Sequence, residues 1–397
     1  MDFDLTDEQD LLRDVTREAL TRAYDIETRL KVADTELGWS RDVWSQLAEI
    51  GILGLGFDPE EAGQIEMMVV LVELGRRLAP EPVVQAALIP GGVIAELGGD
   101  EQRGLLDAVS DGKTLLALAH QEPGMRGMAT RVATRAERHG NSWTVTGRKN
   151  PVLAGDCADV FVTSAALPDF QGERSDGRTG QGERSDGRTG QGERSDGSSG
   201  VGLFLVTADS AKRRAFRTFD GQRAAQLDLD AAPAQPLGSG GDATASLQRT
   251  LIRHQSALCA EAVGAMEEAL RLTTEYLTSR RQFGVPLSNF QALTQRAADM
   301  YVSLELARSM NFYAAMSIAD GNLDPVIAAR AKLQISRSGR HIAQEAIQLN
   351  GGIGVTAEYP VGHYAARLTA INQTLGSADD QLRTLIDALG SYTTVTL

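Results

Sequence analysis

The chain has 397 residues, of which 42% are apolar and 23% charged, an ordinary globular composition that is long enough for two or three domains. Its net charge of −14 argues against nucleic acid or an anionic membrane as a partner, because both would repel it. Five scattered histidines lack ligand spacing, so we expect no metal site. Two distant cysteines, Cys157 and Cys259, and an acidic N-terminus without a signal peptide predict a soluble cytoplasmic protein with reduced thiols.

Residues 1–115 read mostly as helices and form a predicted N-terminal helical domain. Thr6 and Gln9 have the spacing of a capping box, and apolar residues at helical spacing follow them. Ser40 is a good N-cap for the next amphipathic segment. The stretch from Ile65 to Leu78 is apolar on most sides, which predicts a buried helix.

Residues 116–236 form a predicted middle β-domain. Alternation over Arg131–Glu137 and Ser142–Thr146, with a turn between them, predicts a hairpin. Further strands are expected at Val160–Ser164, Gly202–Thr207 and Gln226–Asp230. The stretch from Ala231 to Gly241, rich in Pro, Gly and Ala, reads as a linker.

A decapeptide repeat interrupts the β-domain. The unit Gln-Gly-Glu-Arg-Ser-Asp-Gly-Arg-Thr-Gly occupies 171–180 and 181–190, and a variant of it occupies 191–200. It contains no apolar residue and cannot bury a core, so we expect a flexible insertion over 171–200. A docking tether is one interpretation, and a tolerated duplication at a hairpin tip is the stronger one.

Residues 240–397 return to helical periodicity and form a predicted C-terminal bundle. One long apolar stripe extends from about residue 245 to Ser279. Further helices are expected at 288–319, 324–350 and 377–389. The predicted fold class is therefore α+β, with a helical domain, a β-domain and a four-helix bundle in that order.

Two motifs in the C-terminal part are typical of flavin binding. Arg280-Arg281-Gln282-Phe283-Gly284 and Gln348-Leu349-Asn350-Gly351-Gly352-Ile353-Gly354, followed by Glu358-Tyr359-Pro360-Val361, resemble the flavin-binding motifs of acyl-CoA dehydrogenases. The domain order is also that of this family, and the resemblance spans essentially the whole chain. It implies an acyl-CoA dehydrogenase fold, FAD as cofactor and acyl-CoA as substrate.

In the family that the chain resembles, the pyrophosphate and adenine of each FAD are bound by a neighbouring subunit through these two motifs. Arg280 would pair with the pyrophosphate, and Gln348 would bond to the adenosine portion. Taken singly, Arg280 also fits a solvated cation at a helix end, and Gly351-Gly352 fits a helix C-cap. The implied cofactor-binding residues are Arg280, Phe283, Gln291, Gln348, Gly351 and Gly352.

The half of the site that holds the flavin ring departs from the family pattern. The family sequence Thr-Glu-Pro-Gly-x-Gly-Ser-Asp reads here as 121–128, where the Glu-Pro-Gly turn survives but the later hydroxyl and carboxylate do not. The family sequence Lys-x-Trp-Ile-Thr-Asn-Gly reads here as 149–155, with Pro151 and Leu153 in place of the Trp and Thr. We expect these losses to weaken flavin binding by a few kcal/mol, roughly two decades or more.

The family's catalytic base is also missing. The segment Gln373–Ser377 stands where the family has Tyr-Glu-Gly-Thr-Ser, and Leu375 occupies the position of the catalytic Glu. Some members of the superfamily carry the base on the preceding long helix, where this chain has His254. Histidine can act as a base, although a partly exposed helix histidine without a catalytic role is the stronger interpretation. We therefore assign no catalytic residue.

One hypothesis accounts for an intact donated half beside a defective ring-binding half. The chain resembles the non-catalytic subunits of actinobacterial α2β2 steroid side-chain acyl-CoA dehydrogenases, which implies that it donates FAD contacts to a homologous partner carrying the catalytic Glu. The steroid preference rests on the resemblance alone. Two alternatives stay open: a self-sufficient homotetramer with a relocated base, and a flavin-free acyl-CoA-binding homologue.

Overall fold

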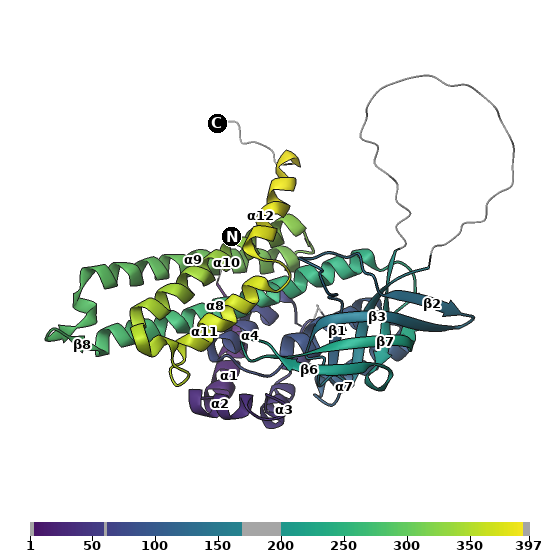
Figure 1. Ribbon diagram of the computed structural model, residues 1–397, viewed down its shortest axis with the longest axis horizontal. Coiled ribbons are helices and arrows are strands. Elements are labelled where there is room, and N and C mark those ends of the chain that lie inside the picture. The colour runs from purple at the N-terminus through teal and green to yellow at the C-terminus, as the bar shows by residue number, and fades with distance from the viewer. Residues whose placement is uncertain (1–3, 59–61, 169–199, 392–397) are drawn as a thin grey trace, which may run out of the picture.

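The computed structural model describes residues 4–58, 62–168 and 200–391. Helices come first, a sheet follows, and long helices complete the chain, with the sheet at one end of the molecule and the bundle at the other (Figure 1). This confirms the predicted α+β class and the order of its parts. The repeat predicted as a flexible insertion lies, apart from Gly200, outside the described residues. None of the described helices is long and apolar enough to cross a membrane.

The N-terminal part is helical, as predicted. Thr6 and Gln9 form the expected capping box, and the Ser40 side chain accepts a hydrogen bond from the Val43 N–H. A π-helical turn at Val84–Leu88 leads directly into α5. The helices are α1 Asp7–Ala23, α2 Ile26–Ala33, α3 Arg41–Glu49, α4 Gln64–Arg77, α5 Ile89–Leu97, α6 Asp100–Arg103 and α7 Leu105–Ser110.

The middle part is a seven-stranded mixed sheet in which β1 pairs parallel to β4, while β3 lies between β2 and β7. The predicted hairpin forms between β2 and β3, although its first strand begins at Arg135 and not at Arg131. The predicted linker from Ala231 is wrong in part, because β7 continues to Pro236 and pairs there with β5. The strands are β1 Leu116–Ala119, β2 Arg135–His139, β3 Ser142–Leu153, β4 Val160–Ala166, β5 Val201–Thr207, β6 Lys212–Arg217 and β7 Arg223–Pro236.

The C-terminal part is built around one very long helix, α8, which runs through the centre of the molecule (Figure 1). A short hairpin, β8–β9, joins α8 to α9 at the end of the bundle away from the sheet. The sequence did not predict α11. The elements are α8 Thr244–Ser279, β8 Arg281–Gln282, β9 Val285–Pro286, α9 Gln291–Ala319, α10 Pro325–Asn350, α11 Val361–Gln373 and α12 Ala378–Asp387.

Two glycines bring α4 and α8 into backbone contact. A β-carbon placed on Gly264 of α8 would lie 1.8 Å from the carbonyl oxygen of Val72, and one on Gly75 of α4 would lie 2.0 Å from that of Glu261. Neither distance is tolerable for a real side chain, so each helix presents its glycine to the main chain of the other. The N-terminal helices are thereby fixed against the bundle.

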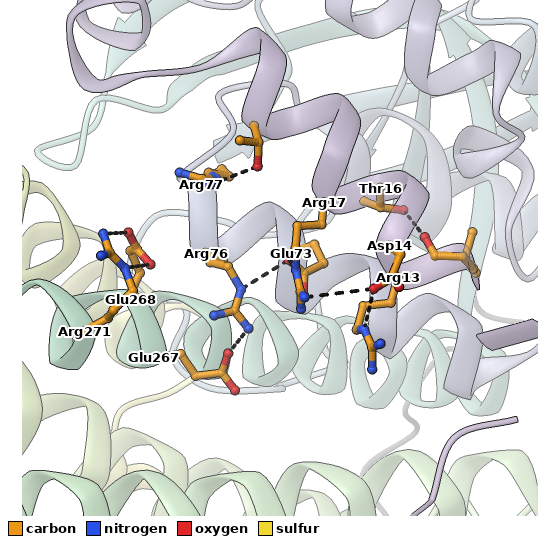
Figure 2. A network of polar contacts seen from close by, with 12 residues as sticks. Arg13, Asp14, Thr16, Arg17, Glu73, Arg76, Arg77, Glu267, Glu268 and Arg271 are labelled. Atoms are coloured by element: carbon orange, nitrogen blue, oxygen red, sulfur yellow. Dashed lines mark hydrogen bonds and ion pairs between the residues drawn. The ribbon is translucent and has the colours of Figure 1, made fainter. Parts of the chain in front are cut away.

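Buried charges surround this helix crossing (Figure 2). The Glu73 side chain is 1% exposed and accepts hydrogen bonds from Arg17 of α1 at 2.8 and 3.0 Å and from Arg76 at 3.2 Å. Arg76 also pairs with Glu267 of α8, which in turn accepts from Arg308 of α9. Four helices therefore share one alternating network, in which the buried carboxylates of Glu73 and Glu267 each have two arginine partners.

Replacing Gly264 with Ala should strongly destabilise the protein, because the new methyl group overlaps the α4 backbone. We expect the free energy of unfolding to fall by about 3 kcal/mol or more, measured by denaturant titration. The matched control is Gly92→Ala in α5, where nothing lies within 4 Å of the new methyl group. That change should raise stability by about 0.5–1 kcal/mol through helix propensity. Equal effects of the two changes would contradict the proposed crossing.

Candidate active site and cofactor groove

A cavity of about 410 Å³ lies where the sheet, α5, α8 and α11 meet. Its wall combines aliphatic side chains with polar ones and with the exposed ring of Phe219. His254 projects into it from α8 and is 8% exposed, so the interpretation of this residue as a partly exposed histidine is wrong. The apolar stripe on α8 did not predict this burial. Hydrophobic periodicity marks one face of the helix, whereas α5 and α11 pack against other faces.

Leu375 belongs to the wall of this cavity. It is 7% exposed and adopts a left-handed backbone conformation with φ of 58°. The Ser377 side chain then caps α12 by accepting from the Asp380 N–H. The one carboxylate in the cavity wall, Asp220, accepts a hydrogen bond from Arg367 at 2.8 Å. The position predicted for the family's base therefore holds a buried aliphatic side chain, and the neighbouring acid is committed to an ion pair.

Several polar side chains of the cavity wall lack partners within the described part of the chain. Both ring nitrogens of His254 and the side-chain nitrogens of Gln85 and Gln121 make no hydrogen bond there. Gln85 belongs to the π-helical turn, a rare conformation that is common at functional sites. Sequence reasoning missed Gln85, and it recorded Gln121 only as a departure from a motif. Nothing in the local sequence signals the π-turn.

The surviving Glu-Pro-Gly turn lies between two residues of the cavity wall, Gln121 and Met125. Glu122 accepts hydrogen bonds from the N–H groups of Ala133 and Thr134 and from the fully buried Lys149 at 2.8 Å. Burial alone would raise the pKa of Glu122, but the Lys149 ammonium and the other donors lower it to about 2. This ion pair fixes the start of the segment whose Pro151 and Leu153 line the cavity. These two residues offer neither an aromatic platform nor a side-chain hydrogen bond.

A second concave region, an open groove of about 560 Å³, lies at the other end of the bundle. It brings together Arg280, Gln348, Gly351 and Gly352, which the sequence motifs place about 70 residues apart. Within the described residues the Arg280 guanidinium has no acidic partner. An unpaired cation in an open groove suits a phosphate-bearing ligand.

The remaining predicted cofactor residues lie beside the groove, outside its lining. Phe283 is 89% exposed on the β8–β9 turn and contacts the ring of Phe290, with 6.1 Å between ring centroids. Gln291 is exposed at the first turn of α9. Ile353 and Val355 are also exposed here, at 41% and 71%. The structure thus places a rim of apolar side chains at the groove, with Ile353 in its lining and Phe283 and Val355 outside it.

Gly351 has two properties that bear on its predicted role. It caps α10 with φ of 63°, so the alternative interpretation as a helix C-cap describes it correctly. A β-carbon there or on Gly352 would meet nothing within 4 Å, so the backbone faces open space. A capping glycine and a backbone accessible to a ligand are compatible at one position. The groove and the cavity share none of their lining residues.

Comparison with known proteins decides the family. The acyl-CoA dehydrogenase N-terminal domain matches residues 6–112, and the C-terminal domain of the same family matches 244–390. A solved variant of the Tcur3481–Tcur3483 steroid ACAD is 31% identical with a TM-score of 0.83, and the alignment covers 97% of this chain and 98% of that chain. The chain belongs to the acyl-CoA dehydrogenase family. The resemblance inferred from the motifs is confirmed, and the family's activity is oxidoreduction of acyl-CoA.

Other relatives support the same assignment. The ChsE4–ChsE5 complex from Mycobacterium tuberculosis is 25% identical with a TM-score of 0.83, covering 99% of this chain and 100% of that chain. The acyl-CoA dehydrogenase FadE27 of the same organism is 25% identical, covering 96% of this chain and 97% of the relative. A Mycobacterium smegmatis glutaryl-CoA dehydrogenase of the same fold, with a TM-score of 0.83 at 20% identity, is in complex with FADH2. FAD is the cofactor of this family.

Because His254 is buried, we expect the free energy of unfolding of the protein to depend on pH. Burial, together with Lys332 and Arg367, lowers the pKa of His254 from 6.5 to about 4. Between pH 6.5 and 4 the unfolded chain therefore takes up a proton that the folded chain does not, and stability falls as the pH is lowered. We expect wild type to lose up to about 3 kcal/mol more than His254→Asn across this window. Denaturant titrations at several pH values measure the difference.

The control is His139→Asn, which removes a largely exposed imidazole of the β2–β3 hairpin. Its pH profile should follow that of wild type. If the profile of His254→Asn also followed wild type, the imidazole would be accessible to protons in the folded state.

Proposed function

We propose that this chain is a subunit of an FAD-dependent acyl-CoA dehydrogenase and that it donates contacts for the ADP part of FAD to a homologous partner carrying the catalytic Glu. When bound, FAD accepts the hydride from the β-carbon of the thioester, while a base removes the α-proton. This chain supplies the groove with Arg280, Gln348 and Gly351. The partner supplies the base and the platform for the flavin ring.

The proposal rests on one observation: the groove keeps the residues expected for cofactor binding, whereas the separate cavity lacks those expected for catalysis and ring binding. The groove keeps an unpaired cation and accessible backbone, as a nucleotide site requires. The cavity has Leu375 at the position of the base and Pro151 and Leu153 at the positions of the ring contacts. Because the two regions share no lining residue, one can be maintained for a neighbouring subunit while the other loses its chemistry.

Two relatives favour a heteromeric assembly of the α2β2 type. Solved structures of the Tcur3481–Tcur3483 steroid ACAD and of the ChsE4–ChsE5 complex each pair two different chains. We propose the same arrangement here, with two flavins per tetramer and a steroid side-chain CoA as substrate. The steroid preference is supported by the 31% identity to the first of these proteins.

The alternative of a self-sufficient homotetramer depends on His254 as the base. The position of His254 favours this alternative, because the side chain lines the cavity and neither imidazole nitrogen has a hydrogen-bond partner among the described residues. Its pKa of about 4 is unfavourable, because a base with so acidic a conjugate acid removes a weakly acidic proton poorly. The unpaired Arg280 weighs against the second alternative, a flavin-free acyl-CoA-binding homologue.

We expect the chain purified alone to show neither full flavin occupancy nor turnover, and to gain both when co-produced with a homologue carrying the Glu. Flavin absorbance per chain and acyl-CoA oxidation measure the two quantities. His254→Ala should leave the activity of the assembled enzyme nearly unchanged. Full flavin content and turnover in the lone protein, abolished by His254→Ala, would establish the homotetramer instead.

Arg280→Ala should selectively weaken FAD binding in the assembled enzyme. Loss of a charge-assisted hydrogen bond costs about 1.5–3 kcal/mol, roughly ten- to hundredfold in the dissociation constant of FAD. The control is Arg281→Ala, which removes an equal charge from the neighbouring residue that does not line the groove. FAD titration of the apo-complex distinguishes them. Equal losses from the two variants would assign the effect to net charge and not to the groove.

A further inference from the structure

A third concave region, the N-terminal pocket, has a volume of about 230 Å³ and lies where α2, the sheet and α11 come together. Part of its wall comes from α2, from the segment that leads into α3 and from the segment that follows α4. Neither the groove nor the cavity at His254 is lined by these segments. The remaining wall shares six residues with the cavity at His254, namely Gln85, Leu153, Phe219, Asp220, Gln222 and Arg367.

Arg29 of α2 is the arginine of this pocket that has no acidic partner among the described residues. Its Nε donates to the carbonyl oxygen of Leu78 at 2.7 Å, while its two terminal nitrogens make no hydrogen bond to the described part of the chain. Four arginines and four carboxylates line the pocket, so the unpaired charge is local and not a net charge of the wall. The other three arginines are ion-paired within it, Arg217 with Asp34, Arg223 with Asp156, and Arg367 with Asp220 and Glu261.

The electrostatic state of Arg29 follows from this arrangement. Burial lowers the pKa of Arg29 below its ordinary value, whereas the hydrogen bond to Glu73 raises the pKa of Arg17. A guanidinium that leaves water without meeting a carboxylate keeps an uncompensated desolvation cost. An anionic ligand would remove that cost through a charge-assisted hydrogen bond.

Two deeply buried side chains of the same pocket carry polar atoms without a hydrogen-bond partner in the described part of the chain. Trp39 is 3% exposed, and the atom concerned is its indole Nε1, a donor, whose neighbour is the weakly accepting thiol of Cys157. The Asp156 side chain is 9% exposed, with Oδ2 3.5 Å from Arg223 and with Oδ1, an acceptor, unpaired. Native proteins rarely retain such atoms, because each carries a desolvation cost.

These three groups define the chemistry of a complementary ligand. Arg29 suits a carboxylate, and the neutral wall favours a single negative charge over a polyphosphate. A hydroxyl group can accept from Trp39 and donate to Asp156. The volume of about 230 Å³ is below the usual range for drug-sized ligands, roughly 300–1,000 Å³, so the ligand is small. Leu30 and Ala79 are among the apolar residues available to its carbon chain.

We propose that the N-terminal pocket binds a small aliphatic hydroxycarboxylate. Its carboxylate pairs with Arg29, and its hydroxyl accepts from Trp39 and donates to Asp156. The ligand is a free acid and not a thioester, and the pocket is too small for a CoA group. The inference goes beyond the proposed function, because it gives the chain a ligand that takes no part in acyl-CoA oxidation.

Isothermal titration of the full chain tests the proposal. The probes are 2-hydroxyhexanoate and 3-hydroxyhexanoate, with hexanoate, hexane-1,3-diol and inorganic phosphate as comparisons. We expect saturable binding of one molecule per chain for one of the two hydroxy acids. Hexanoate should bind about fivefold more weakly, and the diol at least about tenfold more weakly, because each lacks one of the recognised groups. Failure of both hydroxy acids to bind, or equal binding of any comparison compound, would overturn the proposal.

Variants locate the binding. Arg29→Gln removes the unpaired charge and should weaken the binding roughly ten- to hundredfold. Trp39→Phe removes the indole N–H, keeps an aromatic ring beside Trp44 and should weaken the binding about fivefold. The control is Arg22→Gln, which removes an equal charge from the exposed end of α1 and should bind as wild type does. Unchanged affinity in both pocket variants, or an equal loss in the control, would overturn the assignment.

A variant of a different kind guards against misfolding of the polar ones. Ala33→Phe fills the pocket from the end of α2 and leaves Arg29, Trp39 and Asp156 in place. It should abolish binding while thermal unfolding stays cooperative, and full binding in this variant would contradict the site. Because no flavin or partner subunit is present, these results do not depend on whether the chain donates FAD contacts.

Discussion

The arrangement of both functional regions depends on the close backbone contact between α4 and α8 at Gly75 and Gly264. Gly75 faces the main chain of Glu261, and the Glu261 side chain binds Arg367 of α11. Burial alone would lower the pKa of Arg367, but Glu261 and Asp220 raise it, so the guanidinium stays charged. Arg367 then holds Asp220 in the turn between β6 and β7. A contact between two helices thus fixes a turn of the sheet, and that turn forms part of the cavity wall.

Local signals predicted much of the fold because they act within a few residues. The capping box at Thr6, the N-cap at Ser40 and the β2–β3 hairpin are examples. The missed elements lack such signals. All six residues of β6, Lys212–Arg217, are exposed, so no alternation marks it, and it forms by pairing with β7. The linker prediction was wrong over 231–236 because proline suggested irregular chain where β7 continues through Ala231, a residue with φ of 45°.

The candidate site was likewise predictable only in part. The motifs alone predicted that Arg280, Gln348, Gly351 and Gly352 belong together, and the structure gathers them in one groove. Their binding of FAD stays a prediction. The lining of the cavity was not predictable, because it is assembled from the π-turn, α5, α8, α11, two strands and the loops between them, which meet only in the folded chain. His254 shows this limit most clearly. The apolar stripe of a helix predicts which face packs against the core, but it does not predict how many other elements pack against the remaining faces.

The exposed rim of Phe283, Ile353 and Val355 has a thermodynamic consequence for assembly. A cofactor or a subunit that covers these side chains removes apolar surface from water, and such burial carries a negative heat-capacity change. The attraction that it supplies weakens on cooling. In an oligomer joined through this rim, the contribution of these three side chains to subunit association would therefore decrease as the temperature is lowered.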